Sequence, residues 1–158
     1  MKVIFCDVDG VLNNSYTRDR TPSGYRGISN DLVRNLRRIV DATGAVIVLS
    51  SDWRLIREDP IRKRDYWHLL RKLKFAGCLS LYDHTEDIGW DCRGDEIRKY
   101  LDQHTDVTSF VILDDIPFGS FGKAGLLDHL VLTDAADGLT EKDVKRAIRI
   151  LNRQEESF

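Results

Sequence analysis

Two aspartates stand two positions apart near the start of the chain, directly after a short apolar run. Asp7 and Asp9 follow Val3–Cys6, and Gly10 comes next. Two carboxylates at this spacing after a strand can both face a ligand, one at the strand end and the other just beyond it. A glycine next to them lets the backbone turn and approach the ligand closely. Taken alone, the pattern fits a turn or a helix cap equally well, because Asp favours both.

A second acidic pair, Asp114 and Asp115, follows the predicted strand Ser109–Leu113. This pair also fits a turn before Pro117. If the two acidic pairs meet, however, their carboxylates repel one another, and a hard cation such as Mg²⁺ relieves that repulsion. The joint occurrence of the pairs makes Asp7, Asp9, Asp114 and Asp115 the candidate Mg²⁺ ligands.

Hydroxyl and guanidinium groups that could bind a phosphate also stand after a predicted strand or at the start of a predicted helix. Ser50 and Ser51 follow the apolar run Ala45–Leu49, and they offer hydroxyl and backbone N–H donors or simply a helix cap. Arg93 opens an expected helix, where a cation is unfavourable beside the helix dipole, and this mildly favours a functional role. Arg54 is a second candidate, and the sequence leaves open which arginine is the main phosphate-binding cation.

Five strands and four helices are expected to position these residues. The strands are predicted at Val3–Cys6, Ala45–Leu49, Cys78–Tyr82, Ser109–Leu113 and His129–Leu132. The helices are predicted from a cap at Ser29 to Thr43, over Ile61–Leu73, over Gly94–Gln103, and after a capping box formed by Thr140 and Asp143.

The alternation of strands and helices predicts an α/β fold with a parallel sheet of about five strands and helices on both faces. Ligands of such sheets collect at the carboxyl ends of the strands, where the candidate residues stand. We found no repeat or linker, so residues 1–158 are interpreted as one domain.

Composition narrows the class of protein. The 158 residues are 42% hydrophobic and 32% charged, with a net charge of -2 and three cysteines. These values indicate a globular chain, and the apolar runs are too short to span a bilayer. With no export signal visible, we expect a cytoplasmic protein with reduced thiols and no membrane partner.

Three motifs resemble those of the haloacid dehalogenase (HAD) superfamily of phosphohydrolases. Asp7–Leu12 (DVDGVL) resembles the DxDGxx first motif, Val46–Ser50 (VIVLS) the second, and Phe110–Asp115 (FVILDD) the acidic fourth. Arg93 stands where the third motif usually has Lys. Finer details, including Ser50–Arg54 and Thr133–Thr140, resemble the compact HAD domains of Swiss Army Knife RNA-repair proteins. The resemblance spans Val3 to about Leu139 and implies a Rossmann-like domain.

The resemblance also implies a mechanism, that of a Mg²⁺-dependent phosphoric monoester hydrolase. Asp7 would be the nucleophile that forms an aspartyl-phosphate, and Asp9 the general acid and then the general base. Mg²⁺ would be held by the Asp7 carboxylate, the Asp9 backbone carbonyl and Asp115, with Asp114 orienting the third-motif cation or sharing the metal shell. Ser50 and Arg93 would bind the phosphoryl oxygens, and Ser51 and Arg54 stay further candidate phosphate-binding residues.

Many HAD proteins carry a cap domain, but the segment Asn13–Ile28 is too short for one, so an open site is expected. Open sites suit large substrates such as phosphorylated RNA or DNA ends. Basic side chains outnumber acidic ones between Arg54 and Lys74, beside Tyr66 and Trp67, which fits either a nucleic-acid strand or a solvated helix face.

Other functions remain open at this point. The same chemistry could act on small nucleotides, on metabolites or on a phosphoprotein. A receiver-type signalling domain also pairs acids with Mg²⁺, but Leu81–Asp83 fits its third strand poorly. A non-catalytic binding module would retain costly like charges without use. The oligomeric state is not predicted.

Overall fold

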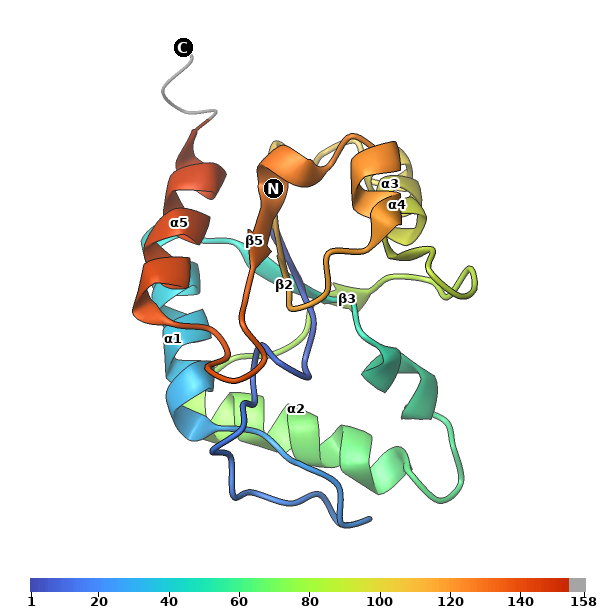
Figure 1. The fold of residues 1–158 in the computed structure, drawn as a ribbon, viewed down its shortest axis with the longest axis vertical. Coiled ribbons are helices and arrows are strands. Elements are labelled where there is room, and N and C mark those ends of the chain that lie inside the picture. The colour runs from blue at the N-terminus through green and yellow to red at the C-terminus, as the bar shows by residue number, and fades with distance from the viewer. Residues whose placement is uncertain (154–158) are drawn as a thin grey trace.

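A computed structural model describes residues 1–153. Its centre is a five-stranded parallel sheet in the order β3-β2-β1-β4-β5 (Figure 1). The strands are β1 (Lys2–Cys6), β2 (Val46–Leu49), β3 (Asp83–His84), β4 (Ser109–Asp114) and β5 (Leu130–Leu132). The predicted α/β class and the parallel sheet are confirmed.

Helices cover both faces of this sheet. On one face α1 (Asn30–Thr43), α2 (Lys63–Gly77) and α5 (Glu141–Asn152) pack onto one hydrophobic core. On the other face α3 (Arg93–Gln103) and the short α4 (Gly119–Lys123) enclose a second, smaller core. Two 3₁₀ helices complete the fold, η1 (Asp52–Ile56) and η2 (Leu127–His129). None of the helices within residues 1–153 is long and apolar enough to cross a membrane.

Capping residues set both predicted ends of α1 and the predicted start of α5, whereas α2 begins two residues after the predicted Ile61 and ends four residues after the predicted Leu73. The Ser29 side chain accepts a hydrogen bond from the Leu32 backbone N–H, and Gly44 ends α1 in the left-handed conformation. Thr140 and Asp143 form the reciprocal hydrogen bonds of a capping box at the start of α5.

The predicted strand at Cys78–Tyr82 is wrong. Cys78 adopts a left-handed conformation that closes α2, and its backbone N–H donates to Lys74 O. The Leu79 backbone N–H donates to Leu73 O, and the Leu79 side chain packs into the core. These apolar residues therefore terminate a helix rather than forming a strand. The edge strand β3 lies just beyond them, where Asp83 and His84 pair with the end of β2.

Contacts with α2 hold the loop after β1 in place. This loop runs beside α2 at the lower end of the view in Figure 1. Asp65 of α2 accepts a hydrogen bond from the Ser23 backbone N–H at 3.0 Å, and His68 of α2 lies 2.6 Å from the Asp19 carboxylate. The loop is thereby attached to α2, although it has no strand or helix of its own.

Candidate active site

The first acidic pair lies at the end of the central strand. Asp7 follows β1 and is buried, and its backbone N–H donates to Leu113 O on the neighbouring β4. Asp9 is exposed, yet its carboxylate is fixed on both oxygens. Asn13 Nδ2 donates to one at 2.8 Å and Trp53 Nε1 to the other at 3.1 Å. The two carboxylates therefore have different surroundings, one dry and one facing solvent.

Asp7 and the second acidic pair converge on one point. Oxygen atoms of Asp7, Asp114 and Asp115 all lie within 4.8 Å of one another. Gly10 lies against this cluster at a φ of +77°, and a Cβ atom there would overlap the Asp115 carboxylate. Thr133 fixes the turn, because its hydroxyl donates to Gly10 O at 2.7 Å.

Electrostatics indicate that the cluster suits a cation. Burial and then the nearby Asp114 carboxylate raise the pKa of Asp7 well above its usual value. Burial, with Asp115 adding to it and Arg93 opposing it, raises the pKa of Asp114 to about 6. Three hard oxygen donors whose negative charges repel are the kind of group that Mg²⁺ binds.

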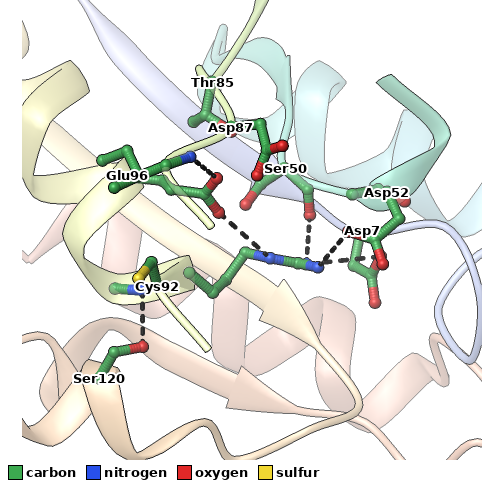
Figure 2. Close-up of polar contacts among 12 residues, drawn as sticks. Asp7, Ser50, Asp52, Thr85, Asp87, Cys92, Glu96 and Ser120 are labelled. Carbon is green, nitrogen blue, oxygen red and sulfur yellow. Dashed lines mark hydrogen bonds and ion pairs between the residues drawn. The ribbon is translucent and has the colours of Figure 1, made fainter. Parts of the chain in front are cut away.

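Arg93 supplies the positive charge that the protein itself brings to this cluster. Its guanidinium lies 3.0 Å from the Asp114 carboxylate and 3.7 Å from that of Asp7, and it donates to Ser50 O at 2.7 Å. Asp52 and Glu96 lie 3.6 and 3.9 Å from the same side chain, and Figure 2 shows Asp7, Asp52, Glu96 and Ser50 around it.

The two serines have different partners. Ser50 joins β2 to β1, because its backbone N–H donates to Cys6 O. Its hydroxyl is buried and has no hydrogen-bond partner among residues 1–153. The Ser51 hydroxyl instead caps η1 by accepting from the Trp53 backbone N–H at 3.2 Å. Ser50 thus combines an unused hydroxyl with a carbonyl that accepts from Arg93, which makes it a candidate phosphoryl-binding residue.

Comparison with known families agrees with this geometry. The family model of the HAD domain in Swiss Army Knife RNA repair proteins matches residues 3–144, which is most of the chain. The chain belongs to this family. Membership indicates a hydrolase of the phosphatase kind, and HAD proteins generally use Mg²⁺. No curated protein and no solved structure matched the chain.

Arg54 occupies a different position in this HAD domain. Its guanidinium is buried, donates to Ser51 O at 2.8 Å, and lies 2.5 Å from Glu96 and 3.6 Å from Asp87. None of the contacts described for Arg54 is with the three-aspartate cluster. Of the two arginines considered from sequence, Arg93 is the one that the fold brings to Asp7 and Asp114.

Three residues of this HAD domain contribute in ways that sequence reasoning missed. Glu96 is buried between the two arginines, and burial raises its pKa despite them. Asn13 and Trp53 hold the Asp9 carboxylate. The position of Glu96 three residues after Arg93 on a helix was a usable signal. The Asn13 and Trp53 contacts depend on a loop conformation and had no such signal.

Proposed function

We propose that this domain is a Mg²⁺-dependent phosphatase that acts through an aspartyl-phosphate and removes phosphate from nucleic-acid ends. The observation that carries the proposal is the convergence of Asp7, Asp114 and Asp115 beside the Arg93 guanidinium. These residues would supply a nucleophile, a metal-binding acid set and a phosphate-binding cation at one edge of the sheet. Phosphoryl transfer depends mainly on such positioning and charge stabilisation.

In the first step an oxygen of the Asp7 carboxylate attacks phosphorus. The new Asp7 O–P bond forms as the bond between phosphorus and the leaving-group oxygen breaks. Asp9 donates a proton to that oxygen. Arg93 and the Ser50 hydroxyl bind the non-bridging oxygens, whose charge must be held during the transfer.

In the second step water attacks the phosphorus of the aspartyl-phosphate. Asp9, now a carboxylate, accepts the proton of the attacking water, and the Asp7 O–P bond breaks. Inorganic phosphate leaves, and both aspartates return to their starting states. The hydrogen bonds from Asn13 and Trp53 keep the Asp9 carboxylate in one place for both proton transfers.

Asp7, Asp114 and Asp115 would hold Mg²⁺, together with the Asp9 backbone carbonyl. The bound ion would screen the charge between carboxylate and phosphate and orient a phosphoryl oxygen. The fit rests on the short separations among the three carboxylates and on the room that Gly10 leaves beside Asp115.

Two features support a large substrate with an exposed phosphate. The connection between β1 and α1 is a loop without a cap domain, so the site stays open. The basic residues of α2 lie mostly on its exposed face, while Tyr66 packs in the core and Trp67 stays half exposed beside Lys63. A positive surface with an accessible aromatic ring is typical of single-strand binding.

The test is phosphate release with and without Mg²⁺. The substrates are a 3′-phosphorylated oligonucleotide, a 5′-phosphorylated one, mononucleotides and a small aryl phosphate, with Asp7→Asn as the inactive control. Mg²⁺-dependent release from one oligonucleotide end supports the whole proposal. Release from small phosphates alone keeps the mechanism and rejects the nucleic-acid substrate. No release from any substrate rejects the phosphatase assignment on these substrates.

A further inference from the structure

A groove of about 270 Å³ adjoins Asp9. It is lined by residues from the loop after β1, from η1 and from the start of α2, namely Asp9, Tyr25, Arg26, Asp52, Trp53, Ile56 and Arg62. Asp9 is the only member of the proposed catalytic set among these residues. Because Asp9 is the proposed general acid, the oxygen that it protonates must lie next to this groove.

The groove offers an aromatic platform. The Tyr25 ring is 56% exposed, and the Arg62 guanidinium lies over it with Cζ 4.2 Å from the ring centroid. Guanidinium contact supports the ring while more than half of the side chain remains accessible. An exposed ring in this setting can stack on a nucleobase.

Cations adjoin the same platform. Arg26 is exposed and has no ion pair within residues 1–153, and it lies next to Tyr25 in the chain. The Nε atom of Arg62 is held by Asp65 at 3.1 Å, and no hydrogen bond from its two Nη atoms to the described residues is present. Both guanidiniums can therefore contact the phosphate of a neighbouring linkage.

The platform is also held in position before any ligand arrives. The Tyr25 carbonyl accepts from the Thr21 backbone N–H at 2.9 Å, and the Tyr25 backbone N–H donates to the Thr21 hydroxyl. Asp65, which is fully buried, binds both the Ser23 backbone N–H and Arg62. One carboxylate thus positions the tyrosine turn and the arginine over the ring, which lowers the entropic cost of binding.

From these contacts we infer that the groove is the leaving-group subsite and binds the terminal nucleoside of the substrate. The base stacks on Tyr25, and Arg26 and Arg62 bind the phosphate of the next linkage. This inference rests on the proposed function, because it assigns the groove by the position of the general acid. It makes Tyr25 and Arg26 specificity-determining residues rather than catalytic ones.

Tyr25→Ala tests the platform, with Tyr16→Ala as the matched control. Tyr16 is an 80% exposed tyrosine of the same loop that does not line the groove. The readout is kcat/KM for the phosphorylated oligonucleotide divided by kcat/KM for glycerol phosphate, which has no base. Tyr25→Ala should lower this ratio about tenfold or more through KM, Tyr25→Trp should restore it, and Tyr16→Ala should not change it. An unchanged ratio in Tyr25→Ala overturns the inference while the phosphatase proposal stands.

Arg26→Gln tests the phosphate contact. Removing one phosphate contact on a single strand should reduce the slope of log affinity against log salt by roughly 0.7. The affinity is measured by fluorescence anisotropy of a labelled phosphorylated oligonucleotide, in the Asp7→Asn background so that the end phosphate is kept. A slope equal to that of the parent variant contradicts the assignment of Arg26.

The same binding assay separates the two proposals. If the wild-type protein releases no phosphate but Tyr25→Ala weakens oligonucleotide binding about tenfold and Tyr16→Ala does not, the groove binds a nucleotide and the proposed hydrolysis is wrong. If Tyr25→Ala binds as tightly as its parent, the subsite is wrong whatever the activity.

Discussion

Arg93 is a cation whose guanidinium lies among several oxygen atoms and over the Phe118 ring. Two carboxylates of the proposed reaction centre, the Ser50 carbonyl and Glu96 all lie within 4 Å of its guanidinium. A lysine has one compact charge and cannot reach these groups at the same time in the same way. The planar group therefore suits a site in which one side chain must neutralise phosphate and also hold acidic residues.

Substitution of Arg93 should separate charge from geometry. Arg93→Gln is expected to lower kcat/KM for phosphate release by about 10²–10³, the usual cost of losing one charge-stabilising donor. Arg93→Lys should retain part of that activity because the charge remains. Arg98→Gln, an exposed position on the same helix, is the control and should behave as wild type. Equal activity of Arg93→Gln and wild type would remove Arg93 from the mechanism.

Gly10 permits a second test at the scale of one residue. Gly10 and Gly44 both have a φ near +70°, where an alanine costs about 1–2 kcal/mol, but only at Gly10 would the new Cβ overlap Asp115. Gly10→Ala should raise the Mg²⁺ concentration for half-maximal activity about tenfold or more, as displaced ligands usually do. Gly44→Ala should lower stability and leave that concentration unchanged. A similar Mg²⁺ requirement in the two variants argues against Asp115 as a ligand.

Much of this site was predictable because its residues follow strands. Asp7 follows β1, Ser50 follows β2, and Asp114 is the last residue of β4. Parallel strands bring such positions to one edge of the sheet. The choice between Arg93 and Arg54 was not predictable. It depends on the side-chain direction at the start of α3, and on Glu96 and Asp87 binding the Arg54 guanidinium.

At the scale of elements, the loop after β1 has a defined structure because α2 holds it. Asp65 and Asp19 are the two carboxylates of this attachment. Burial acts to raise the pKa of Asp65, but hydrogen bonds from Ser23 and Arg62 outweigh it and leave that pKa below its usual value. The pKa of Asp19 is also lowered, because hydrogen bonds from His68 and Ile28 outweigh burial.

The pH dependence of stability should follow from these lowered pKa values. A carboxylate whose pKa is lower in the folded state adds stability above its unfolded pKa of about 4, and that stability is lost as pH falls through the folded value. The free energy of unfolding in urea should therefore fall as pH drops below about 4. Asp65→Asn should be less stable at pH 7 and should lose less on acidification, whereas the exposed Asp31→Asn should follow wild type. Parallel curves for wild type and Asp65→Asn would contradict the attachment.

Strand position was the least predictable property of the elements. Val3–Cys6 and Phe110–Leu113 are apolar throughout because both faces of the central strands are covered, and such runs are easily identified. β3 has only two residues, both polar and half-buried, at the edge of the sheet. No hydrophobic pattern marks a strand of that kind, so the nearby apolar run at Cys78–Tyr82 was wrongly chosen.

At the scale of the whole molecule, the partly buried cluster of three aspartates lowers the free energy of unfolding until a cation binds. Asp7 and Asp114 are buried beside Asp115, and Arg93 is one positive charge among them. A ligand that binds only the folded state adds about 2.7 kcal/mol at a concentration one hundred times its Kd. Mg²⁺ binding should therefore stabilise the entire fold and not only the site.

Thermal unfolding should report this linkage. At a Mg²⁺ concentration about one hundred times its Kd, Tm should rise by roughly 5–10 °C for a chain of this size. Asp115→Asn should abolish most of the shift, and Asp128→Asn, an exposed position near β5, should leave it intact. A shift of the same size in Asp115→Asn would mean that Mg²⁺ stabilises the fold from another place.

The central position of β1 in the sheet sets the order in which parts of the molecule can form during folding. β1 precedes both of its sheet partners in the sequence, β2 and the more distant β4, and Asp114 reaches Asp7 only when β4 has joined the sheet. A chain still on the ribosome, or one in the early stage of refolding, can form α1 and α2 while its reaction centre is incomplete. Long-range pairing of this kind is slow. In refolding experiments, activity should consequently return after the helical circular dichroism signal, so that the chain is folded in part before it can act on any phosphate.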